Sequence, residues 1–146
     1  DALHELRTAL DILRDGDAPR APAPRLDDLD TLVSGVRAGG LEVRVEHDGP
    51  VAPLTAPVEL AAYRIIQEAL TNVTRHARAT TVTVRLGYGD GVTVEVTDDG
   101  TGGPAGPGNG ITGMHERAAA LGGTVAAGPA PSGGFRVAAH LPGHPS

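Results

Sequence analysis

Four polar side chains recur at helical spacing in the segment between Pro57 and Ala79: Glu68, Asn72, Arg75 and His76. The apolar residues of this segment follow a helical period, which predicts one long amphipathic helix with proline in its first turn. At about 100° per residue the four polar side chains fall within roughly 100° of arc, beside the apolar stripe. A carboxylate, a carboxamide, a guanidinium and an imidazole are therefore held at the boundary of the core on a rigid element. A polar shoulder on an ordinary surface helix would give the same pattern.

A second candidate is the string Asp98-Asp99-Gly100-Thr101-Gly102, which directly follows a predicted strand. A carboxylate at a strand end beside glycines can accept a hydrogen bond from an exocyclic amine such as that of adenine. When it is charge-assisted and buried, such a bond gives selectivity for the base. Taken alone, the string also fits a simple Asp-Gly turn.

A third candidate is Gly108-Asn109-Gly110-Ile111-Thr112-Gly113, which has the spacing of a dinucleotide-binding fingerprint. That fingerprint requires a strand immediately before it. Here about ten residues of Gly- and Pro-rich loop intervene, and Glu116 is too near to bind a ribose, so we reject a Rossmann interpretation. Glycines at a helix N-terminus nevertheless let backbone N–H groups approach an anion, although a flexible lead-in to a helix has the same composition.

These strings are positioned by a predicted two-layer α/β (α+β) sandwich, with helices on one face of a mixed, mostly antiparallel sheet. Hydrophobic periodicity predicts helices over Leu26–Arg37, Pro57–Ala79 and Ile111–Leu121. Alternation predicts strands over Leu41–Glu46, Thr81–Leu86, Val92–Thr97, Thr124–Ala127 and Phe135–Leu141, the second and third joined by a loose turn over Gly87–Gly91. We expect residues 26–146 to form one domain, preceded by a Pro/Ala-rich linker over 15–25 and a leucine-spaced helical tail over 1–14.

Composition excludes several classes of function. The 146 residues include no cysteine, and all twelve basic residues are arginine. Thiol catalysis, Cys-type zinc sites, a P-loop lysine and Schiff-base chemistry are therefore excluded. The net charge of −6 argues against a nucleic-acid partner, and no apolar run is long enough to span a membrane. The chain begins with Asp1 rather than methionine, so we expect it to be a piece of a longer protein.

Together the three strings resemble the Bergerat ATP-binding fold of DNA gyrase, mismatch-repair ATPases, a heat-shock chaperone and the histidine kinases. The order is E-x-x-x-N on a helix, D-x-G-x-G after a strand, and G-x-G-x-x-G opening a helix. The match narrows to NarL-type sensor histidine kinases on three stretches: Ile65–Asn72, Arg75–Ala79, and Gly110–Arg117 with Leu121-Gly122-Gly123. The resemblance covers about residues 26–142, and the leading helix is similar to the tail of that family's dimerisation hairpin.

The resemblance implies a role for each matching position, with Mg-ATP as the ligand. Asn72 would coordinate Mg²⁺, and Glu68 would orient a water or help deprotonate the acceptor. Arg75 and His76 would lie near phosphate or ribose. Asp98 would bind the adenine amino group, and the remaining nucleotide contacts would come from Gly100, Gly102, Gly108, Gly110, Ile111, Gly113, Met114 and Gly134. Residues Thr101–Asn109 would form a short lid.

The implied function is that of a cytoplasmic ATP-binding catalytic domain. It would phosphorylate a histidine on a missing dimerisation domain of its own homodimeric protein, for relay to a response regulator; the full-length protein could carry a membrane anchor. The sequence departs from the family in two places. It has no E-L-H-D-like phosphoacceptor motif, since His4 lacks the following aspartate and fits a solvated surface residue, and it has His115 where the family more often has arginine. The alternatives are an anti-sigma-factor-type serine kinase, disfavoured by the hairpin-like residues 1–25, and a non-catalytic nucleotide-sensing module, disfavoured because Glu68, Asn72 and Asp98 are all present.

Overall fold

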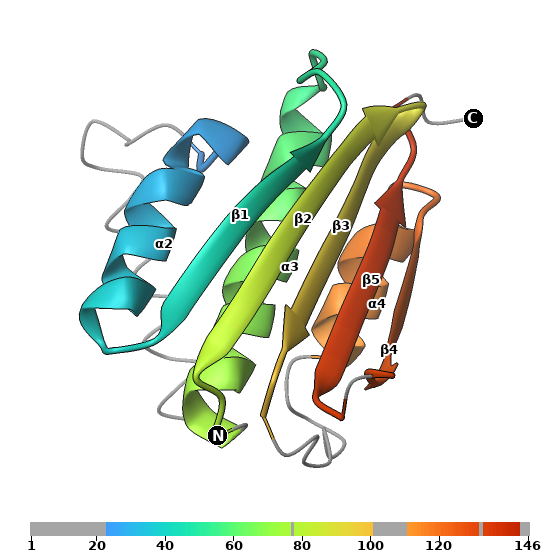
Figure 1. Ribbon diagram of the computed structural model, residues 1–146. Helices are drawn as coiled ribbons and strands as arrows, with labels where there is room; N and C mark the ends of the chain where they lie inside the picture. The colour runs from blue at the N-terminus through green and yellow to red at the C-terminus, as the bar shows by residue number, and fades with distance from the viewer. Residues whose placement is uncertain (1–22, 77, 101–110, 132, 144–146) are drawn as a thin grey trace, which may run out of the picture.

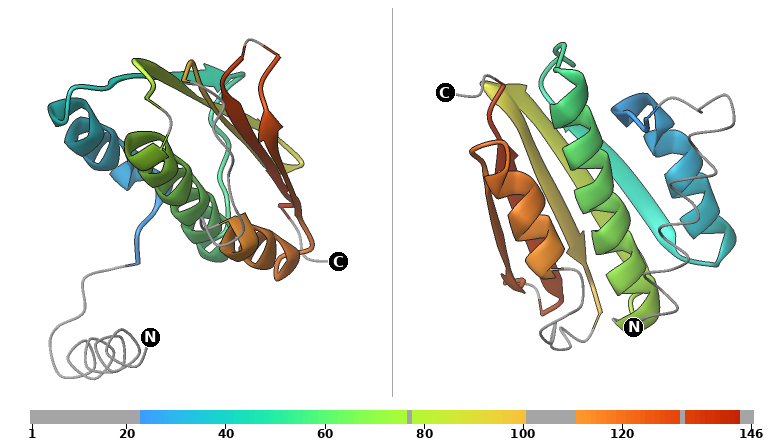
Figure 2. Two further views of the ribbon diagram at one scale, coloured as in Figure 1. Left: turned by 90° about the horizontal axis from the view of Figure 1, so that it is seen from below. Right: turned by 180° about the vertical axis from the view of Figure 1, so that it is seen from behind.

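Helices cover one face of a mixed β-sheet in the computed structural model of the chain (Figures 1 and 2). The structure describes residues 23–76, 78–100, 111–131 and 133–143. The strands are β1 (Glu42–Asp48), β2 (Thr81–Gly89), β3 (Gly91–Asp98), β4 (Thr124–Pro129) and β5 (Phe135–Leu141). The helices are α2 (Leu29–Ala38), preceded by a 3₁₀ turn η1 (Leu26–Asp28), α3 (Ala56–His76) and α4 (Ile111–Ala119). The predicted two-layer arrangement is confirmed.

The sheet order is β1-β2-β3-β5-β4. β1 and β2 pair in parallel, and the remaining neighbours pair antiparallel. A parallel pair needs a long crossover, and α3 supplies it between β1 and β2. The prediction of a mixed, mostly antiparallel sheet is therefore correct.

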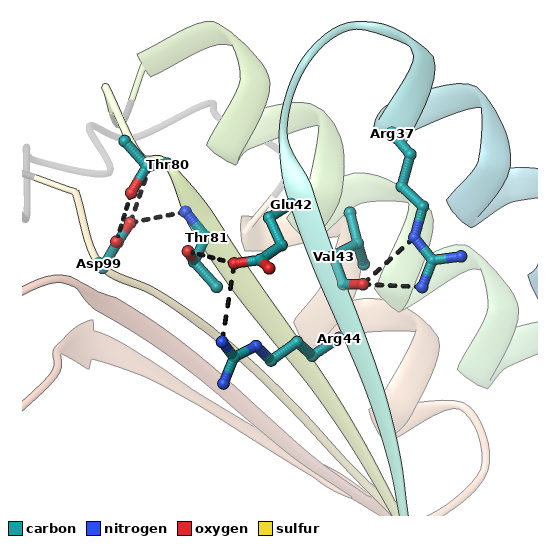
Figure 3. Close-up of polar contacts among 7 residues, drawn as sticks. All are labelled: Arg37, Glu42, Val43, Arg44, Thr80, Thr81 and Asp99. Carbon is teal, nitrogen blue, oxygen red and sulfur yellow. Dashed lines mark hydrogen bonds and ion pairs between the residues drawn. The ribbon is translucent and has the colours of Figure 1, made fainter.

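The core lies between α3 and the sheet and is almost wholly aliphatic. Along β2, Val82, Val84 and Leu86 are buried while Arg85 points to solvent, as the two-residue period of a strand requires. The helices contribute the facing layer, whose fully buried large side chains are Ile65, Ile66, Leu70 and Met114, with Val33 and Val58. Helix α2 is tied to the edge strand β1, because the Arg37 guanidinium donates two hydrogen bonds to the Val43 carbonyl oxygen at 2.8 and 3.2 Å (Figure 3).

The turn between β2 and β3 is tighter than predicted. The expected loose turn over Gly87–Gly91 is wrong, since the ladder continues to the pair Gly89↔Gly91 and only Asp90 lies between the strands. Gly91 has a φ of 88°, and a Cβ there would overlap the carbonyl oxygen of Leu141. The glycines that suggested a loose loop therefore permit a close turn, because glycine adopts positive φ at little cost.

Several predicted segments lie outside the described residues: the helical tail over 1–14, most of the linker over 15–25, and the lid over Thr101–Asn109. Helix α3 ends at His76 and α4 at Ala119, each a few residues before the predicted end. Among the residues that the structure describes, no helix is long and apolar enough to cross a membrane.

Candidate functional site

The elements that carry the predicted site residues meet at one end of the sheet. In Figure 1 the last turn of α3, the end of β3 and the start of α4 all lie at the lower end of the molecule, together with the β4–β5 turn. Contacts between the elements agree, since α3 packs against both β3 and α4. The fold therefore brings together the described parts of the three sequence strings, which are as far apart in the chain as Glu68 and Gly113.

Asp98 is the last residue of β3, and among the described residues it is the one charged side chain buried like the core, at 4% exposure. Its Oδ1 accepts a hydrogen bond from the Gly100 backbone N–H at 2.8 Å. A carboxylate can accept about four hydrogen bonds, so this one leaves capacity for a ligand. Burial of such a group is costly without partners, which makes Asp98 a candidate for recognising a hydrogen-bond donor.

Gly134, in the turn that leads into β5, lies directly against Asp98. It is buried, and a Cβ built on it would overlap the Asp98 carbonyl oxygen and lie 3.0 Å from Oδ1. Only glycine lets the β4–β5 turn approach this closely. The structure thus brings two of the predicted nucleotide-binding residues, far apart in the sequence, into contact.

Glu68 and Asn72 are both half-buried on α3, one turn apart on the same side of the helix. Arg75 is exposed in the last turn, and His76 is the final helical residue. Within the described part of the chain no cluster of three or more His, Cys, Asp or Glu side chains could hold a metal ion. Mg²⁺ is commonly bound by one or two protein oxygens together with substrate phosphates, so the oxygen donors of Asn72 and Glu68 fit that ion as a companion of a nucleotide.

Helix α4 begins at Ile111, where the sequence predicts it to begin. Ile111 and Gly113 are half-buried in its first turn, and Met114 is fully buried in the core. The N-terminus of this nine-residue helix carries the positive end of the helix dipole, which favours an anion. Gly102, Gly108 and Gly110 lie outside the described residues, so their roles stay predictions.

Asp99 is not among the site residues that the sequence predicts, yet its carboxylate accepts three hydrogen bonds from Thr80 and Thr81. These hydrogen bonds hold the pKa of Asp99 below its ordinary value. The Thr81 backbone N–H has the largest effect, and the hydroxyl and the backbone N–H of Thr80 come next. No local pattern in the sequence marks Asp99, because its partners Thr80 and Thr81 come from the segment that follows α3.

The described residues also line cavities away from this end of the sheet. One of about 290 Å³ lies at the other end of β1 and β2, where Val51 and Leu54 meet Asp27, Glu59 and Tyr88. Burial there, followed by the charges of Glu59 and Asp27, raises the pKa of Tyr88. Another, of about 490 Å³, is an open hollow on the uncovered sheet face beside the ion pair of Arg136 with Glu95. None of the predicted site residues lines either cavity.

The sequence of this chain is similar to those of known proteins. The sequence model of the family described as "Histidine kinase-, DNA gyrase B-, and HSP90-like ATPase" matches residues 57–145. The signal transduction histidine-protein kinase/phosphatase UhpB of Salmonella typhimurium is 36% identical over 131 residues, covering 81% of this chain and 26% of UhpB. The chain therefore spans about a quarter of that relative's length.

Solved structures share the fold. The histidine kinase domain of the blue-light activated kinase EL346 of Erythrobacter litoralis superposes with a TM-score of 0.65 at 22% identity, covering 88% of this chain and 68% of that one. The ATP binding domain of PrrB from Mycobacterium tuberculosis gives a TM-score of 0.60 at 24% identity, covering 83% and 96%. Both support the two-layer architecture seen in Figure 2.

Proposed function

This chain belongs to the histidine kinase-, DNA gyrase B- and HSP90-like ATPase family, and we propose that it is the ATP-binding catalytic domain of a sensor histidine kinase. It would transfer the γ-phosphate of ATP to a histidine on the dimerisation domain of its own protein, for relay to an aspartate of a response regulator. The observation that carries this proposal is the buried Asp98 carboxylate at the end of β3, closed on one side by Gly134.

Asp98 is proposed to recognise the adenine base. Its carboxylate accepts the hydrogen bond of the exocyclic amino group, while Gly100 holds Oδ1 in place from the backbone. Because the residue is only 4% exposed, this hydrogen bond forms in a medium where charge-assisted bonds are strong. Gly100 and Gly102 are proposed to make room for the ring, and Gly134 with the strand that follows it is proposed to line the adenine side of the site.

The phosphate end of the nucleotide is proposed to lie between the end of α3 and the start of α4. Asn72 would hold Mg²⁺, which neutralises charge on the phosphates when bound. Glu68, one turn earlier, would orient the reacting group, and Arg75 and His76 would contact phosphate or ribose. On the other side, Ile111, Gly113 and Met114 of α4 and the preceding Gly108 and Gly110 would present the helix N-terminus to the phosphates. Phosphoryl transfer depends mostly on such positioning and charge neutralisation.

The phosphoacceptor and the response regulator are proposed partners. The name of the relative UhpB supports a histidine rather than a serine as acceptor. The histidines among the described residues, which are His47, His76, His115 and His140, are not proposed as the acceptor, because all four lie within the proposed catalytic domain. The acceptor is therefore expected on a dimerisation domain of the full-length protein.

Calorimetric titration of Mg-ADP into the chain tests the proposal. Asp98→Ala removes a hydrogen bond to a charged group, worth about 1.5–3 kcal/mol, so ADP affinity should fall by about ten- to a hundredfold. Asn72→Ala should remove the dependence of binding on Mg²⁺, measured by adding a chelator. Glu95→Ala, which removes a half-buried carboxylate on the same strand as Asp98, is the matched control and should bind like wild type. A wild-type chain that binds no ADP at millimolar concentration would refute the proposal.

A further inference from the structure

Asp99 joins two segments that are distant in the sequence (Figure 3). Its Oδ1 accepts hydrogen bonds from the backbone N–H groups of Thr80 and Thr81, both at 2.9 Å. Its Oδ2 accepts the hydroxyl hydrogen of Thr80 at 2.7 Å. The Asp99 N–H in turn donates to the Thr81 carbonyl oxygen at 3.2 Å, which extends the pairing of β2 and β3 one residue beyond Asp98.

The position of these bonds is informative, because each segment adjoins a part of the proposed nucleotide site. Asp99 follows Asp98, the proposed base-recognition carboxylate, and precedes Gly100, whose N–H holds Asp98. Thr80 lies only four residues after His76, the end of the helix that carries Glu68 and Asn72. In this short connection Arg78 has a φ of 49°, a backbone conformation that non-glycine residues keep only when neighbouring contacts fix it.

The hydrogen bonds of Asp99 are not needed to satisfy a buried group. Asp99 is exposed, so water could replace every one of its partners, and the hydrogen bonds of a solvent-exposed carboxylate make only a modest contribution to the free energy of unfolding. Three donors that converge on the Asp99 carboxylate do, however, fix its orientation. A carboxylate held by two backbone N–H groups and a hydroxyl has one position, and the backbone on either side of it is fixed accordingly.

We propose that Asp99 is a positioning residue for base recognition: its clamp on Thr80 and Thr81 fixes the end of β3 so that the neighbouring Asp98 is correctly aimed at adenine. This inference rests on the proposed function and deepens it. Successive residues of an extended chain point to opposite sides, so Asp99 acts through the backbone rather than by touching the nucleotide. Without the clamp the last residue of β3 can rotate, and the hydrogen bond to the base is lost first.

The distinguishing measurement is selectivity between bases. Mg-ADP and Mg-IDP differ at carbon 6, where inosine carries a carbonyl in place of the amino group that Asp98 would recognise. We expect wild type to prefer ADP. Asp99→Ala should lower ADP affinity by about tenfold and leave IDP affinity nearly unchanged, so that the ratio of the two affinities collapses. A loss of folded protein would instead lower both affinities equally.

Conservative variants sharpen the test. In Asp99→Asn the amide oxygen can still accept both backbone N–H groups and the Thr80 hydroxyl can reverse its role, so the ADP preference should be retained. Should Asp99→Ala fail to fold, as judged by circular dichroism, Asp99→Glu replaces it. That variant keeps the charge but displaces the carboxylate by one methylene, and it should also lose the preference. The matched control is Glu95→Ala, at another position on β3. It removes the 2.7 Å ion pair of Glu95 with Arg136 on β5, and it should keep the preference for ADP.

The outcomes separate the two proposals. A wild-type chain that binds neither nucleotide, or binds both equally, contradicts the proposed role of Asp98 and with it the inference. If wild type prefers ADP and a folded Asp99→Ala variant keeps the same ratio, then only the role of Asp99 is overturned. An equal fall in both affinities in folded Asp99→Ala would overturn it as well.

Discussion

Replacing Gly134 by alanine should damage both the fold and the nucleotide site, because the new methyl group has no space. It would overlap the backbone carbonyl oxygen of Asp98, and it would lie 3.0 Å from the Asp98 carboxylate. The obstacle is backbone of the adjacent strand rather than the end of a flexible side chain, so β5 and β3 must separate locally.

Overpacking of this kind costs about 1–3 kcal/mol, and an obstacle made of backbone places the cost near the upper end of that range. Loss of glycine's freedom in the unfolded chain offsets about 0.4–1 kcal/mol. We therefore expect a net loss of about 2 kcal/mol in the free energy of unfolding. For a chain of this length the melting temperature should fall by about 6–8 °C.

Thermal and urea denaturation measure the stability change, and calorimetric titration of Mg-ADP measures the effect on the site. The matched control is Gly128→Ala in the same β4–β5 hairpin, where a Cβ would meet nothing within 4 Å. That variant should be as stable as wild type or slightly more so, with unchanged ADP binding. If Gly134→Ala proved as stable as Gly128→Ala and bound ADP equally well, the close approach of Gly134 to Asp98 would be disproved.

Two further predictions concern stability. Leu70 is 1% exposed, so Leu70→Ala leaves a cavity in the core and should lower the free energy of unfolding, measured in urea, by about 2–5 kcal/mol. The control is Val51→Ala, at a side chain that is 69% exposed, which should change the free energy of unfolding by less than about 0.5 kcal/mol. The second prediction concerns how the free energy of unfolding changes at acidic pH. Hydrogen bonds from Thr81 and Thr80 lower the pKa of Asp99, and Arg136 lowers that of Glu95. Both contributions are therefore present above the unfolded pKa values of about 3.9 and 4.3 and are lost as the pH falls through the lower folded values. Urea titrations at stepped pH should show stability falling below about pH 4 more steeply in wild type than in the double variant Asp99→Asn/Glu95→Gln; parallel curves would argue against these shifts.

The elements could be predicted from the sequence because their signals are local. The 3.6-residue period between Pro57 and Ala79 and the two-residue alternation of β2 and β3 are determined by neighbours along the chain. The turn at Asp90 was predicted wrongly because alternating glycines are compatible with both a loop and a tight hairpin. The distinction depends on Leu141, whose carbonyl oxygen packs against Gly91 from a strand about fifty residues away.

The sequence by itself indicated which residues could form a nucleotide site, because the order of the strings that carry Glu68, Asn72 and Asp98 resembles the Bergerat ATP-binding fold. Only the tertiary structure showed which other residues come into contact around Asp98. Sheet order, the contact of Gly134 with Asp98, and the clamp of Asp99 on Thr80 and Thr81 join residues that are 18 to 36 positions apart. Such contacts depend on how separate elements pack, and no local period encodes that packing. Asp99 in particular has no signal of its own in the sequence, since an aspartate before glycine is ordinary until its three donors are brought to it.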